Sequence, residues 1–85
     1  MYEVHIPRKA QKSLDSFEFI DYERVFRAVQ RLKSDLRPKQ AKKLAAQPGS
    51  IYRIRVGDFR ILYEIDDKNR IVSIHRIDRR DKVYQ

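Results

Sequence analysis

The 85-residue sequence contains no cysteine and no tryptophan, and it has only two glycines and three prolines. Without cysteine the chain can form no disulfide, and it offers no thiolate as a nucleophile or zinc ligand. No apolar run approaches the roughly 20 residues of a membrane span, and the N-terminus lacks the basic-then-apolar layout of a signal peptide. We therefore expect a soluble cytoplasmic protein with no membrane partner.

Negative charge is also scarce relative to positive charge. The chain has 20 lysines and arginines against 12 acidic residues, which gives a formal net charge of +8. Such a charge attracts nucleic acid, an acidic protein or an anionic surface, and charge alone does not choose among them. We find no internal repeat, linker or low-complexity segment, so residues 1–85 are expected to form a single small domain.

The N-terminal half is expected to form a strand followed by two helices. Residues 2–6 alternate apolar and polar side chains, which predicts a short strand. Residues 8–17 change to helical spacing, and a second amphipathic helix follows, which we expect Asp21 to cap and which should end before Pro38. Residues 39–46 are expected to add one short helical turn.

The C-terminal half is expected to form three consecutive antiparallel strands. Residues 51–56 and 59–65 alternate apolar and polar side chains on either side of a two-residue turn that begins with Gly57. A second turn at residues 66–69 leads into a third strand. Tight turns make all three strands antiparallel, so the register follows from the turns and the alternation.

This register is expected to crowd basic side chains on one face. The first turn sets Arg55 opposite Arg60, and we expect the second turn to set Ile61 against Ile74, which would bring His75 beside Arg60. Like charges directly opposite one another destabilise a sheet, and an ordinary solvated face interleaves acids among them. A concentrated row of arginines therefore indicates a phosphate-bearing polyanion as the ligand.

The fold class predicted from these patterns is α+β. We expect a small, mainly antiparallel sheet of about four strands, in the order β-α-α-β-β-β, with the two N-terminal helices packed on one face and the arginines on the other. The apolar face should comprise Tyr52, Ile54, Val56, Phe59, Ile61, Tyr63, Val72 and Ile74.

Two segments together resemble the RelE/ParE superfamily of bacterial and archaeal toxins. They are residues 52–65, YRIRVGDFRILYEI, and residues 79–84, RRDKVY. The resemblance extends over the whole chain and includes the short first strand, the helical hairpin, the Lys43-Leu44 pair and the tyrosine near the C-terminus. It implies the RelE-like, microbial-RNase-like form of the α+β fold.

The resemblance also implies a function, that of the toxin of a type II toxin-antitoxin system. The RelE branch is known for cutting mRNA in the ribosomal A site without a metal or other cofactor. The ribose 2′-hydroxyl attacks the adjacent phosphate, which leaves a 2′,3′-cyclic phosphate and a 5′-hydroxyl. The catalytic residues implied by matching positions are Arg53, Arg55, Arg60, Arg80 and Tyr84.

These residue types suit the chemistry in part. Fixed guanidinium groups can stabilise the charge that builds on the phosphate. Arginine stays protonated and is a poor general base, so the proton transfer would fall to Tyr84, which has the family match, or to His75. Other basic side chains are expected to steer or bind RNA through the summed positive field. They are Lys39, Lys42, Lys43, Arg79 and Lys82.

Two alternatives to a ribosome-dependent endoribonuclease remain open from the sequence. One is a ParE-like, non-enzymatic inhibitor of DNA gyrase, and the other is a degenerate toxin that only binds RNA. The full arginine set favours the enzyme. The expected partners are a cognate antitoxin protein, the ribosome and mRNA, with DNA contacted only indirectly through the antitoxin.

Overall fold

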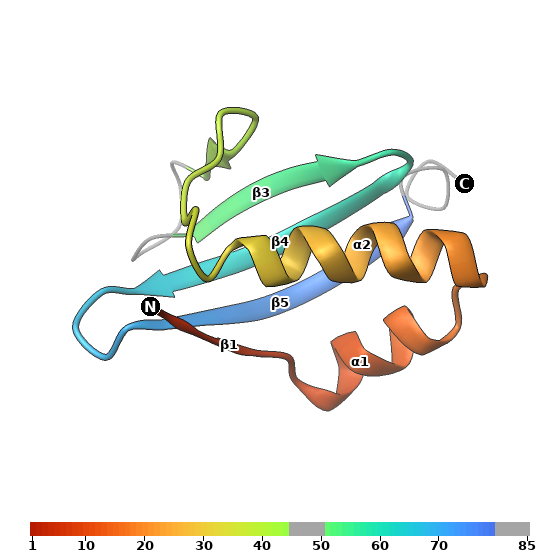
Figure 1. The fold of residues 1–85 in the computed structure, drawn as a ribbon, viewed down its shortest axis with the longest axis horizontal. Coiled ribbons are helices and arrows are strands. Elements are labelled where there is room, and N and C mark those ends of the chain that lie inside the picture. The colour runs from red at the N-terminus through yellow and green to blue at the C-terminus, as the bar shows by residue number, and fades with distance from the viewer. Residues whose placement is uncertain (45–50, 80–85) are drawn as a thin grey trace.

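The computed structural model describes residues 1–44 and 51–79, which form two helices and one mixed sheet (Figure 1). The strands lie in the order β1-β5-β4-β3-β2, with β1 parallel to β5 and every other pair antiparallel. Both helices cover the same face of the sheet, and neither has the length and hydropathy to traverse a bilayer. The elements are β1 (Glu3–His5), α1 (Arg8–Asp15), α2 (Phe19–Arg31), β2 (Lys42–Lys43), β3 (Ile51–Val56), β4 (Phe59–Asp66) and β5 (Ile71–Arg79).

The α+β class and the two helices on one face are confirmed, but the helix boundaries differ from the prediction. Helix α2 begins at Phe19 with Glu18 as its N-cap, so Asp21 lies in the first turn and is not the cap. A carboxylate there still interacts favourably with the helix dipole. The helix ends at Arg31, well before Pro38, because the following amide groups bond to carbonyls three residues back and tighten the chain into turns.

Residues 39–44 do not form the expected helical turn. The amide of Ala41 donates to the carbonyl of Pro38 at 2.8 Å, which closes a turn, and the two-residue strand β2 follows. Lys42 pairs with Arg53, and the amide of Leu44 bonds to the carbonyl of Ile51 at 2.9 Å. Pairing with β3 therefore replaces helical hydrogen bonds here and makes the sheet five-stranded.

The β3–β4 hairpin has the predicted register and turn. Val56 pairs with Phe59, and only the first of the two turn residues, Gly57, has a positive φ, at 58°. That pattern defines the Gly-first two-residue turn. A Cβ atom at Gly57 would lie 2.9 Å from Nη2 of Arg24, so glycine also leaves room for the Arg24 guanidinium against the turn.

The core lies between the helices and the sheet. Strand β4 alternates strictly between buried and half-buried residues along its whole length. Tyr63 is fully buried and donates its hydroxyl to the carbonyl oxygen of Leu36 at 2.9 Å, which satisfies the phenol within the core. The buried residues are Ala10, Leu14, Val25, Val29, Leu32, Ile54, Phe59, Ile61, Tyr63, Ile65, Val72, Ile74 and Ile77.

The predicted register between β4 and β5 is wrong. Ile61 pairs with Ile77, where the sequence pattern suggested Ile74, and Ile74 pairs instead with Tyr63. The β4–β5 turn lies one residue later than expected, because Asp66 pairs with Ile71 and the turn spans residues 67–70, which already shifts the register by two residues between the turn and Tyr63. A β-bulge next to Leu62 adds one more residue on β5, so the shift is three residues from Leu62 onward. A shift of two residues keeps every side chain on its predicted face, so alternation with a period of two cannot reveal it, and alternation cannot reveal the bulge either.

Candidate functional site

The face of the sheet turned away from the helices, called the outer face below, carries a cluster of cations in two rows. Directly opposed residues in a ladder project to the same face, so the strand pairings define each row. The first row runs across three strands as Arg55, Arg60 and Asp78. The predicted pairing of Arg55 with Arg60 is therefore confirmed.

Within the first row, the two arginines have different surroundings. Arg55 is exposed, whereas Arg60 is half-buried and its Nε is buried without a hydrogen-bond partner in the described part of the chain. The side chain of Asp78 is 25% exposed and faces Arg60 across the ladder. Sequence analysis missed this carboxylate next to the arginine pair because of the wrong register.

The second row lies two residues along the strands and includes Lys42, Arg53, Leu62 and Arg76. Sequence analysis did not select Arg76, which the bulge brings to the position opposite Leu62. Its Nη2 lies 3.0 Å from Oδ2 of Asp78, and its side chain is 66% exposed. The clue available in the sequence was an arginine directly after His75, but only the bulge places it in line with Arg53.

His75 does not lie beside Arg60 as predicted. Its Nε2 is 3.0 Å from Oε1 of Glu64, and both side chains are 42% exposed. Arg60 faces Asp78, which is three residues, or about 10 Å, further along β5 than His75. The imidazole therefore belongs to a hydrogen-bonded pair with Glu64 at the margin of the basic rows.

Two further basic residues selected from the sequence, Lys43 and Arg79, lie on the helix side of the sheet. Lys43 pairs with Tyr52, which turns it toward the helix side of the sheet. The guanidinium of Arg79 sits 5.4 Å above the ring of Phe59 and 3.9 Å from Asp21, also on the helix side. Arg80, Lys82 and Tyr84 fall outside the described residues.

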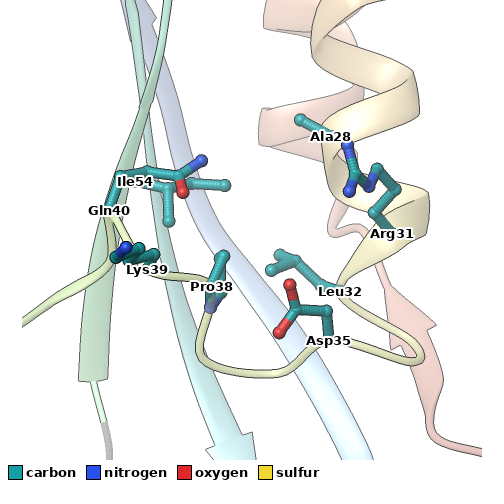
Figure 2. Close-up of a pocket in the computed structure, with 8 residues that line it drawn as sticks. All are labelled: Ala28, Arg31, Leu32, Asp35, Pro38, Lys39, Gln40 and Ile54. Atoms are coloured by element: carbon teal, nitrogen blue, oxygen red, sulfur yellow. The ribbon is translucent and has the colours of Figure 1, made fainter.

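Lys39 lines a cavity of about 300 Å³ between the end of α2 and β3 (Figure 2). The carboxylate of Asp35, the guanidinium of Arg31 and the apolar side chains of Leu32 and Ile54 also line it. The cavity lies in the helix layer, on the other side of the sheet from the arginine rows. It therefore adds nothing to the outer face, and Lys39 is separate from the cluster to which the sequence assigned it.

The clearest shifts in pKa belong to a structural network at one end of the sheet. Tyr2 donates to Asp67 at 2.7 Å, and this hydrogen bond lowers the pKa of Asp67. Arg37 also bonds to Asp67 at 3.2 Å and to the hydroxyl of Tyr52 at 2.9 Å. Burial raises the pKa of Tyr63 to about 12. These contacts tie the N-terminus, the segment after α2 and the β4–β5 turn together, so they stabilise the fold.

Comparison with known proteins supplies independent evidence. A sequence model of the ParE toxin of type II toxin-antitoxin systems, parDE, matches residues 4–84. The RelE1 protein of Methanocaldococcus jannaschii is 28% identical over 86 residues, which cover 99% of this chain and 96% of that protein.

Solved structures share the fold. A chain of the archaeal RelE-RelB complex from Pyrococcus horikoshii OT3 is 26% identical with a TM-score of 0.83, over 93% of this chain and 94% of that chain. The isolated E. coli RelE toxin is 19% identical with a TM-score of 0.80, over 99% of this chain and 92% of that chain. This chain therefore belongs to the ParE toxin family of type II toxin-antitoxin systems and, within the RelE/ParE superfamily, to the RelE-type branch.

Proposed function

We propose that this toxin cleaves mRNA in the ribosomal A site by attack of the ribose 2′-hydroxyl on the adjacent phosphate. The observation that carries the proposal is the direct opposition of Arg55 and Arg60 on the outer face, with Arg53 two residues away. Opposed cations cost stability in a free sheet, so their placement is best explained by an anionic ligand. A protein that cleaves mRNA on translating ribosomes acts in the cytoplasm, so the proposal includes that location.

In this proposal the arginines bind and stabilise the reacting phosphate. In-line attack builds negative charge on the phosphate oxygens, and guanidinium groups donate paired hydrogen bonds to them. Arg60 suits this role because its half-buried position restricts the guanidinium before RNA arrives. Arg80 is proposed to complete the set, and Tyr84 to move the proton, since His75 is engaged with Glu64 away from the arginine pair.

We also propose a cognate antitoxin as the physiological partner. The similar structures include RelE-RelB complexes from Pyrococcus horikoshii and from E. coli. A domain of net charge +8 with an exposed cationic face attracts a partner rich in carboxylates. Such a partner would cover the outer face or hold it away from RNA, and DNA would be contacted only through it.

The test is primer-extension mapping of mRNA on translating ribosomes with purified protein. The wild type should produce discrete cleavages within codons, and Arg60→Ala should reduce the cleavage rate about 100-fold or more, as removal of one transition-state donor does. Arg27→Gln is the matched control, because it removes one exposed positive charge from α2. Equal losses of cleavage rate in both variants would show that the loss follows from the lower net charge, and would refute a specific role for Arg60.

Inhibition of DNA gyrase is the second candidate, favoured by the ParE family model that matches residues 4–84. A supercoiling assay with purified gyrase separates the two functions. Inhibition of supercoiling without any cleavage on ribosomes would establish the ParE-like function. Ribosome binding without cleavage or gyrase inhibition would identify a toxin that only binds RNA.

A further inference from the structure

Both histidines of the chain line the same hollow, which has a volume of about 420 Å³. Strand β1 ends at His5, which pairs with Ser73, while β5 continues beyond that point to Arg79. The hollow lies where β1 stops alongside β5. Its lining residues are His5, Ile6, Pro7, Ser73, Ile74 and His75.

The hollow adjoins the second basic row of the outer face. His5 and Ser73 are directly paired and therefore project to one face, and His75 follows Ser73 by two residues on the same strand. The next residue along β5 is Arg76, which faces Leu62 in line with Arg53. An RNA strand that crosses the arginine rows would thus reach the hollow directly after Arg76.

The lining suits a planar heteroaromatic base. Imidazole rings stack on unpaired bases, and the aliphatic side chains of Ile6 and Pro7 offer apolar walls. When Nε2 of His75 donates to Glu64 at 3.0 Å, its Nδ1 is left as an acceptor for a base amino group. The hydroxyl of Ser73 adds a group that can both donate and accept. A few polar groups among apolar ones are the lining that small-molecule sites commonly have.

A metal site is a weaker explanation for the two histidines. Within residues 1–44 and 51–79, no three histidine, aspartate or glutamate side chains are grouped so that they could hold a metal ion. Each imidazole instead has its own carboxylate neighbour, Glu3 at 3.8 Å from His5 and Glu64 at 3.0 Å from His75. Glu64 is close enough to orient the ring of His75 by a hydrogen bond, whereas Glu3 is too far from His5 to do so.

We propose that this hollow binds an unpaired nucleobase of the RNA and that Arg76 binds the phosphate of the same nucleotide. The inference rests on the proposed nuclease function and deepens it, because it adds a base contact to a face that otherwise contacts phosphate alone. Phosphate contacts position a nucleic acid, whereas contacts with bases distinguish sequences. The hollow would therefore contribute to the choice of the cleaved codon.

The test uses nucleoside 5′-monophosphates as ligands, with ribose 5-phosphate as the matched ligand without a base. Side-chain NMR signals of the full chain are followed during each titration. The imidazole signals of His5 and His75 should shift with the nucleotides and not with ribose 5-phosphate, while the guanidinium signal of Arg76 should shift with both. The double variant His5→Ala, His75→Ala should lose about tenfold or more in nucleotide affinity, the scale of a stacking contact. Arg27→Gln should bind as the wild type does.

Two results would overturn the inference. Imidazole signals that do not move, or that respond equally to ribose 5-phosphate, would show that no base enters the hollow. A double variant that keeps the wild-type affinity while Arg76→Gln loses it would place the nucleotide elsewhere along the basic rows. Cleavage by the wild type on ribosomes is measured separately. Its absence would refute the nuclease function, while the titrations would still show whether a base binds in the hollow.

Discussion

The two faces of the sheet have opposite properties although alternate residues of the same strands supply them. On β4, Ile61 and Tyr63 are fully buried beneath the helices, whereas Arg60 and Leu62 are half-buried on the outer face. Shape and burial constrain the covered face, since close packing penalises any change in volume. Charge dominates the outer face. The comparison indicates that stability and ligand binding are separated between the two sides of one sheet.

The largest expected effect is on the covered face. Ile61→Ala should lower the free energy of unfolding by about 2–5 kcal/mol, because it leaves a cavity at a fully buried position. Urea unfolding monitored by circular dichroism measures the change. Leu62→Ala, the next residue on the same strand, is the control and should cost less because it is half-buried. Equal losses in the free energy of unfolding would show that the two faces do not differ in their contribution to stability.

On the outer face, Asp78 tests whether arginine placement matters beyond charge. Asp78→Asn removes a carboxylate that holds Arg76 at 3.0 Å and faces Arg60. If Asp78 positions these groups, cleavage on ribosomes should fall about tenfold or more, while the added positive charge strengthens RNA binding at low salt. Single-turnover cleavage and binding measured at two salt concentrations separate the effect on arginine positioning from the effect on charge. Faster cleavage would show that Asp78 only weakens the positive field.

Tyr63 provides a smaller effect with a defined pH dependence. Tyr63→Phe removes the hydrogen bond to the carbonyl of Leu36 and should cost about 0.5–1.5 kcal/mol near neutral pH. The pKa of Tyr63 is raised from 10.0 to about 12, so its contribution is fully present below pH 10 and is lost as the pH rises toward 12. Urea midpoints of the two proteins should therefore converge between pH 10 and 12. A constant difference would exclude this linkage.

The smallest expected effect concerns the stability cost of the arginine pair. Arg55→Ala should leave the free energy of unfolding unchanged or raise it by about 0.2–1 kcal/mol, because it relieves repulsion from Arg60. Thermal unfolding at low salt checks this, and the gain should shrink at high salt as screening increases. Arg27→Ala on α2, which breaks an exposed ion pair with Glu23, should give no gain. A clear loss of thermal stability in Arg55→Ala would show instead that Arg55 stabilises the fold.

Much of the candidate site was predictable because local rules govern it. The turn at Gly57 fixes the β3–β4 register, so the opposition of Arg55 and Arg60 followed from the sequence. The position of His75 was not predictable, because the later β4–β5 turn and the bulge together shift β5 by three residues and leave His75 next to Glu64. Arg76 was missed for the same reason.

The sequence by itself determined the α+β class, the two amphipathic helices, the hairpin and the excess of positive charge, since each depends on spacing or composition within a few residues. Tertiary structure decided the parallel pairing of β1 with β5, the existence of β2 and the bulge. These features depend on contacts between segments far apart in the chain. A strand of two residues has no period to detect, and a bulge breaks the alternation on which register prediction depends.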